Sequence, residues 1–250
     1  MRSRHELAEG LLPKVLASNA QLDSLPLGGP HRVQTVNLHH LALAERSDDF
    51  WSAMLSADYV TADGWPVVQL FRSRGLDLER VTGSEWLSRA VGSNALAGHR
   101  VGLLGGSHDV GARFKRILGE SLVFREHGNR DEWSATQIAE DATRMDVDVL
   151  LVAVTPPYGD LIAMKLVDAG YVGTVMSVGG GVDMLVGAQR AAPEWLKRFG
   201  LEWFARLSAN PRRLWRRYFV ECMPTFVRVI VPALVVRTPS APASSYEGVR

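Results

Sequence analysis

The sequence contains one cysteine, Cys222, among 250 residues. A single thiol excludes an intrachain disulfide, which indicates a reducing compartment. The first 25 residues carry several charged side chains and lack the continuous apolar core of a secretory signal peptide. Long hydrophobic runs are also absent. The longest, residues 226–236, is interrupted by Arg228 and Pro232 and falls short of the roughly 20 residues that a spanning helix needs. These absences predict a cytoplasmic chain without a transmembrane helix.

Charge of one sign does not dominate, since the formal net charge is +1, but the cations are unevenly distributed. Seven Lys and Arg residues lie between positions 197 and 217, against Glu202 alone. Such a cluster attracts phosphate, nucleic acid or an acidic membrane surface. Arg206, Arg213 and Arg216 have a spacing that places them near one face of a helix. Interleaved aromatic residues suit a membrane interface, although a solvated helix with aromatics packed beneath it shows the same pattern.

Short apolar runs alternate with longer amphipathic segments from residue 32 onward. The pattern predicts strands at residues 33–37, 59–61, 100–104, 149–154 and 175–178. It predicts helices at residues 6–20, 41–57, 67–74, 84–96, 110–118, 134–144, 161–169 and 192–199. Strands that alternate with helices are typical of a parallel sheet with helices on both faces. We therefore expect an α/β, Rossmann-like fold.

Four regions follow from this pattern. An N-terminal helix and linker, residues 1–30, end at a Gly-Gly-Pro break, and the Rossmann-like core spans residues 31–196. A basic, amphipathic helical appendage follows at residues 197–237. The Pro- and Ser-rich tail, residues 238–250, is predicted to be disordered. The apolar part of the appendage suits insertion into lipid or burial in a homo-oligomer interface, and the sequence leaves both open.

Polar residues and glycines stand where the predicted strands end, and they are Thr35, Asn37, Asp63, Gly105, Gly106, Gly180 and Asp183. Ligands of parallel sheets bind beyond the carboxyl ends of the strands. Glycine N–H groups and helix N-termini can hold phosphate there. A nucleotide or sugar site and a set of ordinary tight turns both fit these loops. The loops lack a P-loop lysine and a Gly-x-Gly-x-x-Gly turn, which argues against a nicotinamide-dependent oxidoreductase.

Asp63 lies just past the second predicted strand, beside Gly64. A carboxylate held there could take a proton from an acceptor hydroxyl, whereas the simpler interpretation is a cap of the next helix. Asp146 and Asp148 resemble a metal-binding pair of acids, but they precede a strand, at the edge opposite the expected ligand crevice. We expect no metal site and no cofactor.

Taken together, these motifs resemble the WecG/TagA/CpsF family of glycosyltransferases. The similarity runs in order from residue 32 to residue 217. It is carried by residues 34–40, 57–64, 79–84, 101–106, 178–183, 187–195 and 200–207, with Pro211, Arg213 and Arg216. Each segment is weakly specific by itself, and their order along the chain makes the resemblance specific.

The resemblance implies an inverting, metal-independent transferase that moves a sugar from a UDP-sugar to a polyprenyl-diphosphate-linked glycan in cell-surface polysaccharide synthesis. It also implies a peripheral position on an anionic membrane surface, at the inner face of the plasma membrane. Asp63 matches the family's proposed catalytic base, and Thr35 and Arg80 match active-site residues. The appendage arginines that would close over the site and hold the diphosphate are Arg206, Arg213 and Arg216.

One loop departs from the family pattern. Where relatives usually carry Gly-x-Pro-Lys-Gln-Glu, this chain reads Thr-Pro-Pro-Tyr-Gly-Asp over residues 155–160. Tyr158 replaces the lysine, and Gly159 replaces the glutamine, an active-site residue of relatives. A lost amide removes hydrogen bonds on which specificity depends. We therefore expect an altered donor or acceptor, with Tyr158 at the substrate and a neutral hexose such as glucose among the candidate sugars.

Two further functions stay open. Loss of the amide also fits a non-catalytic homologue that binds a nucleotide sugar or a lipid, although Asp63 and Arg80 are retained. The basic segment alone would suit a nucleic-acid-binding module. That segment follows a complete α/β core, so we expect no nucleic-acid partner.

Overall fold

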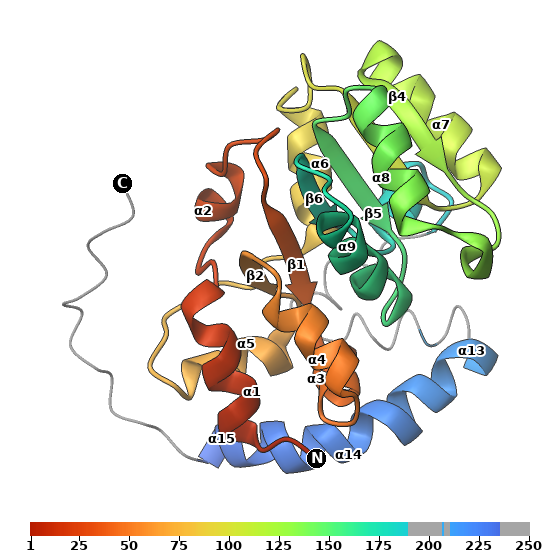
Figure 1. Ribbon diagram of the computed structural model, residues 1–250. Helices are drawn as coiled ribbons and strands as arrows, with labels where there is room; N and C mark the ends of the chain where they lie inside the picture. The colour runs from red at the N-terminus through yellow and green to blue at the C-terminus, as the bar shows by residue number, and fades with distance from the viewer. Residues whose placement is uncertain (190–206, 208–210, 236–250) are drawn as a thin grey trace.

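A computed structural model describes residues 1–189, 207 and 211–235. Its centre is a six-stranded sheet in the order β2-β1-β6-β5-β3-β4, with every neighbouring pair parallel (Figure 1). The strands are β1 (Arg32–Val36), β2 (Tyr59–Ala62), β3 (Val101–Gly105), β4 (Leu122–Glu126), β5 (Val149–Ala153) and β6 (Thr174–Ser177). The predicted α/β class with a parallel sheet is confirmed.

Helices cover both faces of this sheet. The longer ones are α1 (Arg4–Leu11), α3 (Leu38–Ala44), α4 (Asp48–Leu55), α5 (Trp65–Arg72), α6 (Gly83–Gly92), α7 (His108–Leu118), α8 (Ala135–Arg144) and α9 (Tyr158–Asp168). The short elements between them are η1 (Leu12–Lys14), α2 (Asn19–Asp23), η2 (Gly119–Ser121), η3 (Arg130–Glu132) and α10 (Gly181–Leu185).

The layers follow from alternation along nearly unbroken apolar strands. In β5, Val149 and Leu151 join the apolar cluster under α6 and α7, whereas Leu150 and Val152 join the cluster under α8 and α9. A third cluster, around the β1–β2 end of the sheet, includes α1, α3, α4 and α5. Because the inner strands are buried on both faces, their functional groups are confined to the strand ends.

The last described segment is one continuous helical run, residues 211–235, which lies along α1, α3 and α5 (blue in Figure 1). It comprises α13 (Pro211–Trp215), η4 (Arg216–Cys222), α14 (Met223–Thr225), η5 (Phe226–Ile230) and α15 (Val231–Val235). The elements η4 and η5 are π-helical, and each comes just before a proline, Pro224 or Pro232. A proline has no N–H for the usual helical hydrogen bond, which is why the preceding turn widens.

Apolar and charged contacts both hold this C-terminal run on the core. Val229, Ile230 and Ala233 are buried in the same cluster as α1 and α5. The buried carboxylate of Glu45, which follows α3, accepts a hydrogen bond from Thr225 and pairs with Arg228 Nη2 at 3.0 Å. The run is therefore part of the packed domain.

The sequence-based prediction that no helix is long enough to cross a membrane is wrong, because it underestimated the length of the C-terminal helix. Arg216–Val235 forms 20 helical residues and contains an 18-residue window with a mean hydropathy of 1.5, long and apolar enough to cross a membrane by length and composition alone. The prediction counted only the apolar run at residues 226–236, and the helix extends further toward the N-terminus. Of this window, 28% is buried against the rest of the chain.

The structure differs from the sequence-based prediction in one missed strand and in several helix bounds. The sequence does not predict β4, since Arg125 and Glu126 interrupt its apolar pattern at the edge of the sheet. The helix expected at residues 6–20 ends at Leu11, because a 3-10 turn containing Pro13 follows. The helix expected at residues 41–57 is two helices, and Ser47 caps the second by accepting a hydrogen bond from a first-turn N–H at 3.2 Å. The helix expected at residues 192–199 and the tail lie outside the described residues.

Candidate active site

The strands β3 and β5 diverge at a topological switch point. β3 leads through α7 to β4 on one side, whereas its neighbour β5 leads through α9 to β6 on the other. In open α/β sheets, ligands bind in the crevice that such a divergence leaves at the carboxyl ends of the strands.

A cavity of about 330 Å³, here called the switch-point cavity, lies at this position. It is lined by the ends of β3 and β5 and by the loops after β3, β4, β5 and β6: Gly105, Gly106, Gly128, Arg130, Trp133, Ala153, Val154, Thr155, Gly179, Gly180, Asp183 and Gln189. The fold thus brings together Gly105, Gly106, Gly180 and Asp183, which the sequence predicts as substrate-binding residues. Its lining is rich in glycine, so backbone groups can approach a ligand closely.

Gly105 allows the ends of β3 and β5 to lie this close. Its φ is +102°, and a Cβ there would lie 2.7 Å from the Ala153 carbonyl oxygen. Any side chain would therefore displace the backbone of β5. α7 starts just beyond, where Ser107 Oγ accepts a hydrogen bond from the Val110 N–H at 3.3 Å. The N-terminus of α7 adds partial positive charge to this edge.

Two lining residues, Arg130 and Trp133, are missed by the sequence reasoning. Both follow β4, the strand that the sequence does not predict. The Arg130 guanidinium carbon lies 4.8 Å from the ring centroid of Tyr158, a cation–π geometry. Tyr158 begins α9, and half of its surface is exposed. This contact places the predicted substrate residue Tyr158 beside the switch-point cavity.

Asp63 lies at the same edge of the sheet, beyond β2. Its N–H donates to the Val36 carbonyl at 2.8 Å, which fixes Asp63 next to Asn37 at the end of β1. The N-cap position of α5 is occupied by Gly64. The simpler interpretation of Asp63 as a helix cap is therefore wrong. Asn37 itself caps α3, with its Oδ1 accepting a hydrogen bond from the His39 N–H at 3.0 Å.

Arg80 is held near Asp63 through the backbone. The Val81 N–H donates to the carbonyl oxygen of Ala62, the last residue of β2, at 3.0 Å. The Arg80 guanidinium forms an ion pair with Glu85 in the first turn of α6. The Arg80 guanidinium is therefore fixed at the carboxyl end of β2, the strand next to β1.

Thr35 connects this group to the loop that lines the switch-point cavity. Its hydroxyl donates to the Ser177 carbonyl at 3.3 Å, two residues before Gly179. Gly83 permits α6 to start here, because a Cβ would lie 2.7 Å from the same Ser177 oxygen. Asp63, Thr35 and Arg80 are thus grouped at the ends of β1, β2 and β6. None of the three belongs to the described lining of the switch-point cavity.

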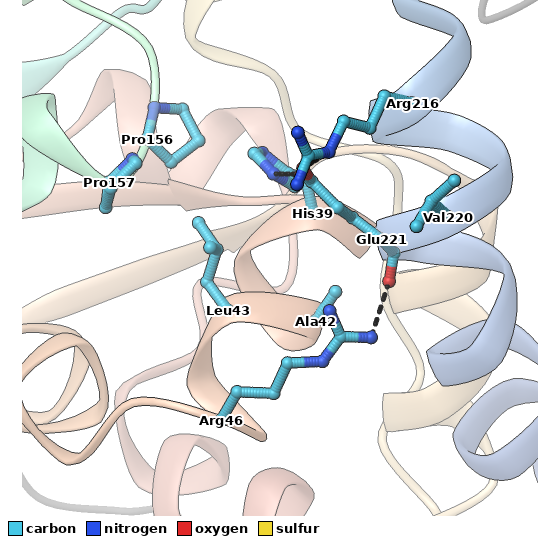
Figure 2. Close-up of a pocket in the computed structure, with 9 residues that line it drawn as sticks. All are labelled: His39, Ala42, Leu43, Arg46, Pro156, Pro157, Arg216, Val220 and Glu221. Carbon is cyan, nitrogen blue, oxygen red and sulfur yellow. Dashed lines mark hydrogen bonds and ion pairs between the residues drawn. The ribbon is translucent and has the colours of Figure 1, made fainter.

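A second cavity, of about 480 Å³, lies between α3, the loop after β5 and η4 (Figure 2). We call it the interhelix cavity. Its lining is His39, Ala42, Leu43, Arg46, Pro156, Pro157, Arg216, Val220 and Glu221. Thr155 lines the switch-point cavity and the next two residues line this one, so the two cavities share one loop.

Glu221 organises the polar side of the interhelix cavity. Its carboxylate lies 3.0 Å from His39 Nε2 and 3.8 Å from Arg216 Nε, and its backbone carbonyl accepts from Arg46 Nη2 at 3.2 Å (Figure 2). Burial lowers the pKa of His39 to about 4, helped by the positive charge of Arg217 and opposed by the hydrogen bond to Glu221. His39 is therefore neutral near pH 7.

Beneath the loop shared by the cavities, Asp160 forms buried polar contacts. Its Oδ1 accepts a hydrogen bond from Gln34 Nε2 at 2.6 Å and lies 3.5 Å from His40 Nε2. His40 Nδ1 accepts from the Asn37 N–H at 3.1 Å. These contacts connect the start of α9 to the end of β1. They therefore fix the shared loop, which precedes α9, relative to the group formed by Asp63, Thr35 and Arg80.

Of the predicted appendage arginines, only Arg216 has a described side chain, and it lines the interhelix cavity. Arg213 lies in α13, and its side chain is outside the described set. Arg206 lies outside the described residues. Their predicted role with the diphosphate stays a prediction.

Comparison with known proteins decides the family. The model of the glycosyl transferase WecG/TagA/CpsF family matches residues 15–238. The chain belongs to this family. A relative from Bacillus subtilis (strain 168), named N-acetylglucosaminyldiphosphoundecaprenol N-acetyl-beta-D-mannosaminyltransferase, is 26% identical over 189 residues, which cover 74% of this chain and 73% of the relative. Membership favours glycosyl transfer over the oxidoreductase and nucleic-acid alternatives.

In this WecG/TagA/CpsF family member, the backbone at the start of the loop shared by the cavities leaves no room for a side chain at Gly159, the second residue of α9. A Cβ on Gly159 would lie 2.4 Å from the Val154 carbonyl oxygen and 3.0 Å from its carbon. Both atoms belong to the backbone, so a side chain could enter only if the loop moved. The glutamine of the family pattern is therefore incompatible with this loop conformation.

Proposed function

We propose that this glycosyltransferase moves a hexosyl group from a UDP-sugar to a polyprenyl-diphosphate-linked acceptor, with inversion and without a metal ion. The main support is spatial. A carboxylate, Asp63, and a glycine-lined cavity at the switch point occupy one edge of a parallel sheet. This arrangement, in a chain of a glycosyltransferase family, fits a donor site and a general base that lie at the same edge of the sheet.

The switch-point cavity is the proposed donor site. Backbone N–H groups of its glycines and the N-terminus of α7 suit the negative charge of a diphosphate. Asp183 offers a carboxylate that can accept hydrogen bonds from sugar hydroxyls. The volume of the switch-point cavity, about 330 Å³, is within the usual range of small-molecule sites.

Asp63 is the proposed general base. As the acceptor hydroxyl oxygen bonds to the anomeric carbon, its proton passes to the Asp63 carboxylate. The bond between the anomeric carbon and the β-phosphate oxygen breaks, and its electron pair leaves with UDP. Attack from the face opposite the leaving group inverts the anomeric centre. Cationic groups at the edge, Arg80 among them, would stabilise the charge that develops in this step.

The interhelix cavity is the proposed acceptor site. Arg46 and Arg216 supply guanidinium groups, which bind phosphate oxygens bidentately. Leu43, Val220 and the two prolines form an apolar wall beside them, which suits the start of an isoprenoid chain. An acceptor held there would lie across the shared loop from the donor.

The outer face of the C-terminal helical run is the proposed contact with an anionic membrane, at the inner face of the plasma membrane. Large apolar side chains are exposed along it: Trp215, Val220, Met223, Val227, Val231, Leu234 and Val235. Arg212 and Arg216 are exposed at its N-terminal end. Apolar residues flanked by cations are typical of helices that lie in a membrane interface. Liposome flotation with and without anionic lipid tests this part.

The transferred sugar is the least constrained part. The relative from Bacillus subtilis is named for N-acetylmannosaminyl transfer to a diphosphoundecaprenol-linked N-acetylglucosamine. Gly159 excludes a side chain at the position where the family pattern has glutamine. We therefore propose a donor screen that includes UDP-glucose beside UDP-N-acetylmannosamine.

The test is UDP release from a panel of UDP-sugars, with a short polyprenyl-diphosphate sugar acceptor and EDTA present. Turnover with one donor supports transfer and metal independence together. Binding of UDP without turnover on any donor would favour the non-catalytic alternative. That alternative rests on Gly159, where the structure leaves no space for the glutamine side chain of the family pattern. No binding of UDP at all would contradict the proposed donor.

A further inference from the structure

Arg130 occupies a special place in the switch-point cavity. Among the described residues that line this cavity, it is the one with a positive charge. It comes from η3, after β4, whereas the aromatic ring beneath it, Tyr158, starts α9 after β5. The contact therefore joins the two chain segments that flank the ends of β3 and β5.

The stacking leaves the guanidinium usable for a ligand. A cation–π contact involves the flat face of the guanidinium. The five N–H donors lie in the plane of the group and can still bind an anion bidentately. The ring also restricts where the long side chain lies, so less conformational entropy is lost on binding.

A second observation concerns the same chain segment. Trp133, three residues after Arg130, lines the cavity, and its indole Nε1 is buried. No hydrogen-bond acceptor within the described residues reaches this nitrogen. Leaving a buried donor unpaired costs roughly 1–3 kcal/mol, and Trp133 Nε1 is the unpaired buried side-chain donor among the described residues that line this cavity.

We propose that Arg130, positioned by the Tyr158 ring, binds the diphosphate of the nucleotide donor and stabilises the charge on the departing nucleoside diphosphate. This inference rests on the proposed function and adds a residue that the family motifs do not contain. In the reaction, the electron pair of the broken anomeric C–O bond stays on the β-phosphate oxygen. A guanidinium donor at that diphosphate lowers the energy of the leaving group.

The sequence of the shared loop fits this role. Tyr158 stands where the family pattern has lysine, so the residue at this position carries no cation. Arg130 supplies a positive charge directly above the tyrosine ring. In this chain, the positive charge at this corner of the cavity therefore comes from the segment after β4.

The experiment is isothermal titration of UDP and of uridine, with EDTA present, into the full chain and its variants. For Arg130→Ala we expect UDP affinity to fall about 10–100-fold, because one charge-assisted contact is lost. Uridine affinity should stay unchanged, since uridine has no diphosphate. Arg130→Lys should retain part of the UDP affinity, and Tyr158→Phe should retain all of it. Tyr158→Ala should lose less than Arg130→Ala.

Arg113→Ala is the matched control. Arg113 lies on α7, where it pairs with Asp109 at 2.8 Å, and the substitution removes the same charge away from the cavity lining. Unchanged UDP affinity in a folded Arg130→Ala variant would overturn the inference and leave the proposed function intact. An equal loss for UDP and uridine would also overturn it, because the effect would not then be on the diphosphate. If the wild-type chain bound no UDP, the proposed donor would fail, and this inference with it.

Discussion

The switch-point cavity and the interhelix cavity lie on either side of the loop at residues 155–157, and different parts of the chain form them. Strand ends and glycines line the first, so much of its surface is backbone held by the sheet. Side chains of α3 and η4 line the second, so its shape depends on how the C-terminal helical run docks.

This difference separates two tasks. A backbone-lined site changes little when single side chains change, which suits the constant nucleotide part of a donor. A site between helices can vary with the residues on either helix, which suits the more variable acceptor. Asp63 lies at the same edge, beyond β2, and neither cavity includes it in the described part of the chain.

The largest expected effect comes from Asp63→Asn, which tests whether the chemistry is separate from both cavities. We expect transfer to slow about 100-fold or more, because an amide cannot accept the proton. UDP affinity and acceptor KM should stay unchanged. Steady-state kinetics with the best donor, together with UDP titration, measure these quantities. A rate close to that of the wild type would remove Asp63 from the base role.

Gly159→Ala tests whether the shared loop is as tightly closed as the geometry indicates. The added Cβ would meet the Val154 carbonyl, and we expect a loss of about 1–3 kcal/mol in the free energy of unfolding. Gly92→Ala is the control, since a Cβ there has nothing within 4 Å and should be neutral or stabilising. Urea unfolding of both variants gives the comparison. Equal stability of the two variants would mean that the loop accommodates a side chain.

Arg216→Ala tests the assignment of the interhelix cavity to the acceptor. We expect acceptor KM to rise about 10-fold. A hydrogen bond to a charged group contributes roughly 1.5–3 kcal/mol, and an exposed guanidinium such as that of Arg216 contributes at the lower end of this range. Donor KM should not change. Arg212→Ala removes a neighbouring exposed arginine that is not part of the described cavity lining, and it should have little effect. A change in donor KM alone would reverse the assignment of the two cavities.

The last prediction concerns the docking of the helical run and its dependence on pH. The folded-state pKa of His39, about 4, is below the ordinary value of 6.5, so the unfolded chain binds more protons between these pH values. Stability should therefore fall as the pH drops from 6.5 toward 4, by no more than about 3 kcal/mol from this residue. His39→Gln should flatten this part of the profile, whereas the control His5→Gln, at an exposed site, should not. Urea unfolding at pH 7 and pH 5 measures both slopes.

Much of the candidate site could be predicted from the sequence. The alternation of apolar runs and amphipathic segments predicts a parallel sheet, and the carboxyl ends of parallel strands meet at one edge. Asp63, Gly105, Gly180 and Asp183 all follow predicted strands, and the structure places them at that edge. Strand-end residues are predictable because their position depends only on where the neighbouring strand stops.

The residues that were missed follow from one missing strand. β4 ends in Arg125 and Glu126, so it does not look like the buried strands beside it. Without β4, the sequence does not predict where in the fold the segment with Arg130 and Trp133 lies. The helical run was underestimated for a related reason. Arg228 and Pro232 break the apolar pattern at residues 226–236, yet the helix continues through π-helical turns that precede Pro224 and Pro232.

The sequence by itself determined the α/β class, the glycosyltransferase family and the set of residues at the carboxyl ends of the strands, because these depend on local periodicity and on short motifs. Only the tertiary structure decided that β3 and β5 diverge as neighbours, that Arg130 lies over Tyr158 and that Glu221 meets His39. It also decided that the Val154 carbonyl fills the space at Gly159. Except for that last contact within one loop, these are contacts between segments far apart in the chain. Their geometry depends on packing, which no local pattern records.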